Sequence, residues 1–371
     1  YPAPLTPPPW PYPFAMDREA GIQAYQDMIT PAAYKERLAR GDTKGLAHKV
    51  VDHADSPVLQ MVVSKVEKMT EDITKFEFRD PDGGNLPEWA AGAHLDIVIA
   101  PEFLRQYSMS GNPADRSTYQ IGVLREDEGR GGSKLMHRIF SEGRRVFLSK
   151  PINHFPLDHA ATRTILMGGG IGVTPMIAMG HELCAANAGF TLHYSVPSRR
   201  KAGFLADLEH VPWADRVQLH VSDEGTRADL DQVLQGYSDG WHVYTCGPDR
   251  YMNAVIEAAE RQGFPEEARH LEYFSVPELP EYENHPFTLR LARTGIDLEV
   301  PADRIATDVL AENEIPIDVK CSDGLCGVCK CRLISGQVEH RDFVLSSAQQ
   351  AEAIILCQSR AAEPGGVIEI D

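Results

Sequence analysis

The sequence is poor in positive charge and contains no long apolar segment. Its 36 Lys and Arg residues are outnumbered by 54 Asp and Glu residues, which gives a formal net charge of −18. Nucleic-acid phosphates would repel such a chain, so the composition excludes a nucleic-acid-binding function. No run of 18 or more apolar residues occurs, so the sequence predicts no membrane-spanning helix. An acidic surface is suited instead to docking on a basic patch of a partner protein.

Three further features of the sequence bear on the cellular location of the protein and on the reactions that it can catalyse. The N-terminal stretch lacks a charged segment followed by an apolar core, so we expect no signal peptide. Seven cysteines in a chain of this length suit a reducing cytoplasm rather than a disulfide scaffold, so we expect a cytoplasmic protein. Rieske-type Cys–His pairs and a facial cluster of two His and one carboxylate are not evident, so we do not expect the chain to oxygenate a substrate itself.

The cysteines gather near the end of the chain, with the spacing of a plant-type [2Fe–2S] site. Four residues separate Cys321 from Cys326, two separate Cys326 from Cys329, and Cys357 follows later. Zinc sites or structural thiols are the alternatives, but zinc ribbons usually add a second C-x2-C pair or His partners, which are missing here. We therefore expect these four cysteines to be the cluster ligands. Cys331, two residues past a ligand, is expected not to be one.

The length of 371 residues favours two or three domains. Residues 1–55 form an extension whose first fourteen residues include seven prolines, which forbid a helix there. From Asp17 to Arg40 the apolar pattern turns helical. Two interpretations of this arm stay open: it packs on its own protein, or it docks on a partner subunit.

From Pro57 the apolar period changes to two, which predicts a small antiparallel β-barrel up to about residue 158. Within it, Arg105, Tyr107 and Ser108 supply a cation, an aromatic wall and a hydroxyl within four residues. A planar, phosphorylated cofactor needs such a set, although an ordinary strand with one exposed Arg is the alternative. The strands expected in this barrel include Leu59–Val66, Ile73–Phe78 and His94–Ile99.

A glycine-rich stretch, Gly129–Ser133, precedes a helical pattern in the same predicted barrel. Glycines that open a helix present free backbone N–H groups at the positive end of the helix dipole, which is a favourable seat for phosphate. We expect Ser133 to be the N-cap of that helix.

A parallel α/β sheet is predicted next, because strands alternate with helices. The strand Thr164–Met167 runs into Gly168–Met176, where glycines alternate and do not follow the Rossmann G-x-G-x-x-G fingerprint. A glycine turn after the first strand still lets a ligand approach a helix N-terminus. The last expected strand, Trp241–Thr245, leads into Cys246, beside the edge where open sheets bind ligands; a buried core thiol is the alternative for Cys246.

A Pro/Glu-rich segment, residues 277–284, has the composition of a linker. Beyond it the pattern predicts a hairpin made of Phe287–Leu291 and Ile296–Val300, then a helix from Ile305 to Asn313, and then the cysteine loop.

With these motifs the chain resembles the phthalate dioxygenase reductase family, which includes vanillate demethylase reductases. The resemblance covers residues 57–371. It implies an FMN-binding barrel (56–158), an NAD(P)H-binding domain (159–276) and, after the linker, a ferredoxin domain of the β-grasp type (285–371). It rests on Arg105–Ser108, Gly129–Ser133, Phe155–Asp158, Gly168–Pro175, Cys246–Pro248, the cysteine loop and Cys357–Ala361.

The resemblance also implies cofactors and residue roles. It implies FMN rather than FAD, and it places Thr174 and Cys246 at the nicotinamide and Phe274 over the flavin ring. Leu124 departs from the family, whose members often have Lys near the flavin phosphate. Together with Asp223, which follows a strand, the residues expected at flavin and nucleotide are Arg105, Gln106, Tyr107, Ser108, Arg125, Gly131, Gly132, Ser133, Gly168, Gly169, Gly170, Gly172, Val173, Thr174, Pro175, Gly247 and Pro248.

The expected function is that of a reductase component of an oxygenase, which passes single electrons from NADH through flavin and cluster to a terminal oxygenase. Asp223 favours NADH, because a carboxylate accepts the ribose 2′-hydroxyl and repels a 2′-phosphate; the basic turn Arg199–Lys201 is the argument for NADPH. The partner is expected to be a Rieske iron oxygenase, with a haem monooxygenase subunit as the alternative. A non-enzymatic iron–sulfur sensor or carrier would predict broken flavin and nucleotide motifs, and these are intact.

Overall fold

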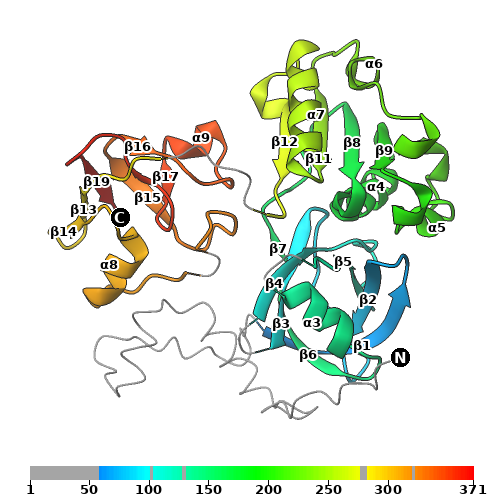
Figure 1. Cartoon of the computed structure of the whole chain (residues 1–371), viewed down its shortest axis with the longest axis horizontal. Coiled ribbons are helices and arrows are strands. Elements are labelled where there is room, and N and C mark those ends of the chain that lie inside the picture. Colours follow the sequence, from blue (N-terminus) through cyan, green and yellow to red (C-terminus); the bar gives the residue numbers. More distant parts are fainter. Residues whose placement is uncertain (1–57, 101–102, 128–130, 276–281, 320–321) are drawn as a thin grey trace. The chain divides into compact units, whose positions relative to one another are not determined.

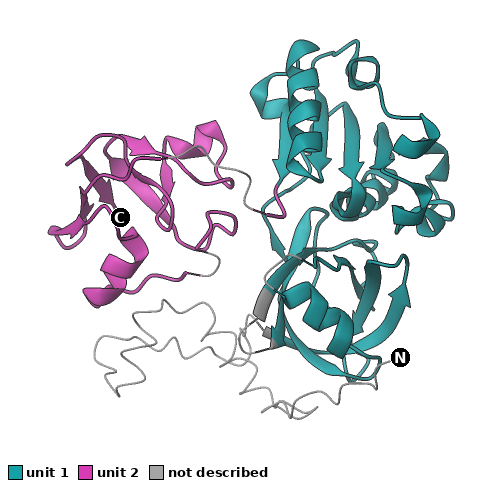
Figure 2. Ribbon diagram, viewed as in Figure 1, with its two compact units in different colours: residues 1–25, 53–272 teal, residues 26–52, 273–371 magenta. Residues whose placement is uncertain are grey.

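The computed structural model of the chain describes all residues except 1–57, 101–102, 128–130, 276–281 and 320–321 (Figure 1). The proline-rich extension, Cys321 and most of the Pro/Glu-rich segment thus lie outside the described residues. The chain divides into two compact units, and the division falls between Glu272 and Tyr273 (Figure 2). Among the described residues, no helix is long and apolar enough to cross a membrane.

The first unit begins with an antiparallel barrel, as the alternating pattern predicted. Its strands follow the order β4-β3-β6-β1-β2-β5, and an isolated bridge from Met109 to Ile121 joins the two ends. Helix α3 (Gly132–Ile139) contributes Leu135 and Met136 to the barrel core. The strands are β1 (Val58–Lys68), β2 (Ile73–Arg79), β3 (Ala93–Ala100), β4 (Phe103–Ser108), β5 (Tyr119–Leu124), β6 (Arg145–Ser149) and β7 (Ile152–Asn153), which pairs with β3.

The same unit continues into a parallel sheet of order β10-β9-β8-β11-β12. Leu166 and Leu192 lie in the core on the side of α4, and Ile165 and Val255 lie in the core on the side of α7, so helices cover both faces. Strand β12 was not predicted: the last expected strand was β11. The elements are β8 (Arg163–Gly169), α4 (Val173–Ala185), β9 (Phe190–Val196), α5 (Leu205–Leu208), β10 (Val217–Val221), α6 (Leu230–Leu234), β11 (Trp241–Cys246), α7 (Asp249–Arg261) and β12 (Arg269–Glu272).

The second unit has the ferredoxin-type α+β fold. The predicted hairpin is present as β13 and β14, and the predicted helix as α8. The sheet order is β14-β13-β19-β15-β17, with β13 parallel to β19, and β16 pairs with β18. The elements are β13 (Phe287–Leu291), β14 (Ile296–Val300), α8 (Ala306–Glu312), β15 (Lys330–Ser335), β16 (Val338–Glu339), α9 (Ser347–Gln350), β17 (Ala353–Ile355), β18 (Arg360–Ala361) and β19 (Val367–Ile370).

Candidate functional site

A hydroxyl and a carboxylate from distant parts of the chain meet where the barrel joins the parallel sheet. Ser108, the last residue of β4, donates a hydrogen bond of 3.0 Å to Oε2 of Glu272, the last residue of β12. Burial raises the pKa of Glu272 to about 7, and the bond from Ser108 lowers it only in part. A carboxyl group with this pKa can hold or release a proton near neutral pH.

Cys246 adjoins this pair through the register of the sheet. It ends β11 and pairs with Glu272 on one neighbouring strand and with Gly168 on the other. Its side chain is completely buried, and this burial, reinforced by the Glu272 carboxylate, raises the pKa of the thiol well above its ordinary value. Cys246 is therefore a neutral thiol, suited to packing against a ligand and not to nucleophilic attack.

The two glycine-containing loops at this edge contact each other backbone to backbone. A Cβ atom on Gly172 would lie 2.2 Å from the carbonyl oxygen of Cys246, and one on Gly247 would lie 2.9 Å from Cα of Gly169. Gly170 differs, because its φ of 55° is left-handed and no atom lies within 4 Å of its Cβ position. The structure thus brings the two predicted loops together.

The first turn of α4 links the parallel sheet to the barrel. The Thr174 hydroxyl donates to the carbonyl of Ile171 at 3.0 Å. Its methyl carbon lies 3.0 Å and the Phe204 ring 2.6 Å from the Cβ position of Gly122 in β5, so a side chain there would have to displace both. Thr174 and its neighbours Val173 and Pro175 are buried. Pro248 approaches the Cβ position of Gly169 to 3.2 Å.

A cation and an uncapped helix terminus come together in the barrel. Nε of Arg105 lies 2.7 Å from the Cβ position of Gly132, so the guanidinium packs against the first turn of α3. Tyr107, two residues further along the same strand, has its pKa raised by burial. Cationic and N–H donors at one place fit the phosphate of a bound flavin.

The N-cap prediction for Ser133 was wrong. The N-cap of α3 is Gly131, with a left-handed φ of 85° and no side-chain cap bond. The left-handed residue turns the chain into the helix two positions earlier than expected. The Ser133 hydroxyl instead accepts a hydrogen bond of 3.1 Å from the backbone N–H of Glu126 and so holds the preceding loop.

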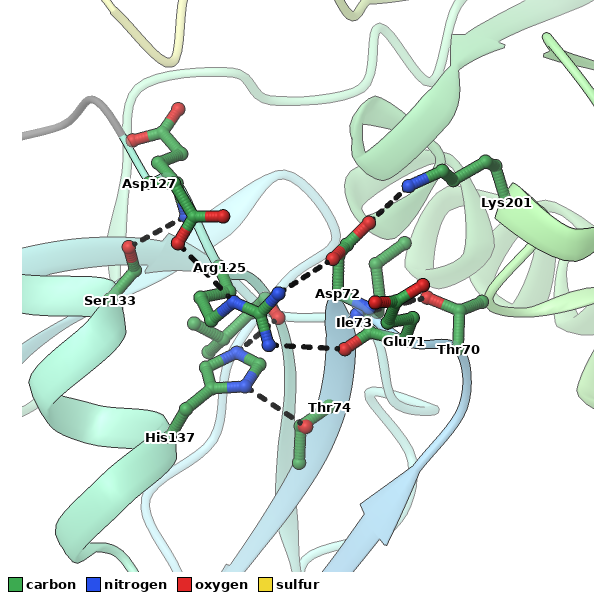
Figure 3. Close-up of polar contacts among 12 residues, drawn as sticks. Thr70, Glu71, Asp72, Ile73, Thr74, Arg125, Asp127, Ser133, His137 and Lys201 are labelled. Atoms are coloured by element: carbon green, nitrogen blue, oxygen red, sulfur yellow. Dashed lines mark hydrogen bonds and ion pairs between the residues drawn. The ribbon is translucent and has the colours of Figure 1, made fainter. Parts of the chain in front are cut away.

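Two other predicted contact residues are engaged by the protein itself. Nη2 of Arg125 lies 3.0 Å from Oδ1 of Asp72, whose other oxygen pairs with Lys201 from the parallel-sheet domain (Figure 3). This network connects the β1–β2 turn with the loop before α3. Nε2 of Gln106 lies 2.9 Å from Nε2 of His94 on β3.

The basic turn that argued for a 2′-phosphate is partly neutralised. Arg199 pairs with Glu224 at 2.7 Å, and Lys201 pairs with Asp72. Asp223 lies in the turn after β10, and its backbone N–H bonds to the carbonyl of Pro197 at 3.1 Å.

The cysteine loop has the curled backbone that its glycines predicted. Gly324 and Gly327 have left-handed φ values of 77° and 67°. Cys326, Cys329 and Cys357 are buried, while Cys321 lies outside the described residues. In the part of the chain that is described, no three His, Cys, Asp or Glu side chains gather as a metal site. The fit to a cluster therefore rests on three buried thiols and on the left-handed glycines that curl the loop.

Cys331 and Phe274 are two further residues for which the sequence predicted a role. Burial raises the pKa of Cys331 to about 11, and its role as a non-ligand stays a prediction. Phe274 is 43% exposed and lies two residues beyond β12, at the start of the second unit, so its covering of a flavin stays a prediction.

Glu272 is the functional residue that the sequence reasoning missed. The available signal was an acidic residue at the end of a short apolar-containing stretch, one position before the aromatic pair Tyr273 and Phe274. Without the strand β12, nothing in the sequence connected it to Ser108, which is 164 positions away.

Comparisons with known proteins show similarity along most of the chain. Residues 289–362 match the family described as a 2Fe-2S iron-sulfur cluster binding domain. The chain is 36% identical over 317 residues to a vanillate O-demethylase oxidoreductase of Pseudomonas sp. (strain HR199 / DSM 7063), which covers 84% of this chain and 100% of that protein. The crystal structure of phthalate dioxygenase reductase is 35% identical, with a TM-score of 0.62, over 85% of this chain and 99% of that one.

A larger protein contains a similar module. An intact type IV self-sufficient cytochrome P450 monooxygenase is 34% identical, with a TM-score of 0.78, over 89% of this chain. This chain spans only 44% of that protein's length.

Proposed function

The chain belongs to the phthalate dioxygenase reductase family, and on this premise we propose that it takes hydride from NADH onto FMN and passes single electrons through a [2Fe–2S] cluster to a terminal oxygenase. It is an electron-transfer oxidoreductase of the flavin and iron–sulfur type. Flavin accepts electrons in pairs and releases them singly, and a [2Fe–2S] cluster carries one at a time. The protein's own task is to hold these groups and to control protons and water around them.

The observation that carries the proposal is the meeting of Ser108, Cys246 and Glu272. Ser108 belongs to the motif expected at the flavin, and Cys246 to the motif expected at the nicotinamide. The 3.0 Å bond from Ser108 to Glu272, which pairs with Cys246 in the sheet, supports one site shared by the two motifs. A carboxyl group with a pKa of about 7 can keep the Ser108 hydroxyl oriented and hold a proton beside it. The buried thiol of Cys246 excludes water next to this pair.

FMN is the proposed flavin. Arg105 and the first turn of α3, which has no side-chain cap, form one compact anion-binding site that suits a single phosphate. FAD would need further contacts for its second phosphate and adenosine. Releasing the flavin by heat and separating it by chromatography against FMN and FAD standards tests this choice, and FAD in the released fraction would overturn it.

NADH is the proposed donor. Two of the three cations in Arg199–Lys201 face carboxylates, and Asp223 adds a further negative charge where a 2′-phosphate would bind. The exposed Arg199–Glu224 pair is worth little by itself, so the proposal depends chiefly on Asp223.

The decisive experiment is an anaerobic titration of the purified protein with NADH and then NADPH, followed by visible absorbance and EPR. Bleaching of the flavin together with a reduced [2Fe–2S] signal supports the proposed path. Flavin reduction without any cluster signal would contradict it and leave a plain flavin reductase.

Nucleotide preference is tested by Asp223→Asn. Removing the carboxylate is expected to raise kcat/KM for NADPH relative to NADH by about tenfold, since one repulsive contact at a charged group is worth roughly 1–2 kcal/mol. Asp215→Asn is the matched control, because Asp215 is an exposed carboxylate at the opposite end of β10. An unchanged ratio in Asp223→Asn would place the 2′ site elsewhere.

For the partner we propose a Rieske non-haem iron oxygenase, docked with help from residues 1–55. The similarity to a P450 monooxygenase that contains a comparable module supports a haem partner as the second candidate. Reduction of one purified partner type, but not the other, by the NADH-reduced protein distinguishes them. Deleting residues 1–55 should weaken that reduction at limiting partner concentration, and an unchanged rate would remove the extension from docking.

A further inference from the structure

The chain passes from the first unit to the second between Glu272 and Tyr273, and each of these residues makes a specific contact within its own unit. Glu272, the last residue of the first unit, accepts the hydrogen bond from Ser108 and pairs with Cys246 in the sheet. Tyr273, the first residue of the second unit, packs edge-on against Phe343, with ring centroids 5.1 Å apart and planes at 62°. Edge-to-face packing at this distance is an attractive geometry for two aromatic rings.

Phe343 belongs to a segment that supports the cysteine loop. Its backbone N–H donates to the carbonyl of Gly324 at 3.1 Å. The neighbouring Asp342 side chain is fully buried and accepts from the backbone N–H groups of Val344 and Leu345 at 3.2 and 2.9 Å. Phe343 is thus held in place by its neighbours and is hydrogen-bonded directly to the loop that carries the predicted cluster ligands.

The C-terminal end of the Pro/Glu-rich segment, Tyr282–Asn284, contacts Arg341, two residues before Phe343. The guanidinium of Arg341 lies 4.3 Å from the ring centroid of Tyr282, and its Nη1 donates to Oδ1 of Asn284 at 2.6 Å. Arg341 and Phe343 are two residues apart, and between them they hold both Tyr273 and the Tyr282–Asn284 end. Tyr273 and the Tyr282–Asn284 end are therefore both held by contacts within the second unit.

From these contacts we propose that Tyr273 is a positioning residue for electron transfer from flavin to cluster. Packed on Phe343, it reduces the connection between the units to the single peptide bond Glu272–Tyr273. Without this packing, the nine residues 273–281 would separate Glu272 from Tyr282, a stretch that can extend to about 30 Å. The inference rests on the proposed function, because it matters only if electrons pass between the units.

A shorter connection raises the effective concentration of the cluster at its electron donor. Effective concentration falls roughly as the −3/2 power of connection length once the connection exceeds the span that it must bridge. Releasing Tyr273 is therefore expected to slow flavin-to-cluster transfer by about tenfold. Reduction of the flavin by NADH should not change, since Ser108, Cys246 and Glu272 lie in the first unit and the variant retains Phe274, the residue expected over the flavin ring.

The test uses the full chain with Tyr273→Ala, and Tyr273→Phe as the conservative control. Stopped-flow absorbance follows flavin reduction by NADH, and freeze-quench EPR follows the appearance of the reduced cluster. We expect Tyr273→Ala to slow only the second step, and Tyr273→Phe to restore it because the ring is retained. Visible and EPR spectra matching those of the unsubstituted protein would show that the cluster loop has kept its structure.

A length series supplies the second measurement. About ten Gly/Ser residues inserted between Glu278 and Leu279 lengthen the stretch between Tyr273 and Tyr282 and leave the contact of Tyr273 with Phe343 unchanged. The proposal predicts little effect of this insertion alone and a further slowing when it is combined with Tyr273→Ala. Equal slowing in both backgrounds, or a cluster step in Tyr273→Ala within about twofold of the unsubstituted rate, would overturn the proposal.

Cluster reduction in the unsubstituted protein separates failure of the proposed function from failure of the role proposed for Tyr273. If the unsubstituted protein reduces its flavin but never its cluster, the proposed function fails before Tyr273 is tested. If its cluster is reduced and Tyr273→Ala is equally fast, only the role of Tyr273 is refuted.

Discussion

At the residue scale, the chemistry of Glu272 depends on its surroundings. An ordinary glutamate is ionised at neutral pH, whereas burial holds the pKa of Glu272 at about 7. The folded protein therefore binds a proton that the unfolded chain releases at a pH near 4.5. Since the folded state then binds more protons between these two values, stability must fall as pH rises through this window.

Glu272→Gln should remove this pH dependence. The amide cannot ionise but can still accept from Ser108. Urea unfolding at pH 5 and pH 7.5 should show a loss of at most about 3 kcal/mol in the unsubstituted protein, and a smaller loss in Glu272→Gln. Glu267→Gln, at an exposed position in the turn before β12, is the matched control and should behave like the unsubstituted protein. The same loss in all three proteins would show that Glu272 titrates normally.

At the scale of elements, the two glycine-containing loops touch at the side of the candidate site where we propose that the nicotinamide binds. The parallel strands β8 and β11 were predicted from their apolar runs, and the loops after them from their glycines. That the loops touch could not be read from the sequence, because it depends on the two strands being neighbours in the sheet. Strand β12 was missed for a related reason: it is four residues long and only partly buried, so it lacks a strong apolar pattern.

Gly172→Ala tests the loop contact. The added methyl would lie 2.2 Å from the Cys246 carbonyl oxygen, so the two backbones must move apart. We expect a loss of about 1–3 kcal/mol in unfolding free energy and weaker reduction by NADH. Gly189→Ala is the control, because the nearest atom to its Cβ position is 3.5 Å away. Gly172→Ala with the same urea midpoint and rate as Gly189→Ala would contradict the close contact.

At the scale of the whole molecule, the proposed cofactors set how many electrons the protein can store. A flavin takes two and a [2Fe–2S] cluster takes one. Anaerobic titration of the full chain with dithionite should therefore consume three electrons per protein.

Cysteine variants separate the cluster's share of this capacity. Cys329→Ser, which removes a predicted ligand, should lower the capacity to two electrons and abolish the reduced-cluster EPR signal. Cys331→Ser should keep three, since the C-x4-C-x2-C…C spacing leaves Cys331 outside the predicted ligand set. A loss of cluster in Cys331→Ser would overturn the ligand assignment.

The sequence alone determined the features that are encoded locally: the cysteine spacing, the glycine loops, the Arg105–Ser108 motif, the three fold types and the family. Each of these is read from short motifs or apolar patterns, within which backbone geometry follows directly from residue type. Only the tertiary structure brought Ser108 to Glu272, started α3 after Gly131, and placed Tyr273 on Phe343. The Ser108–Glu272 and Tyr273–Phe343 contacts join residues far apart in the chain, and burial then shifts the pKa of Glu272. A property that arises from long-range packing has no counterpart in local sequence.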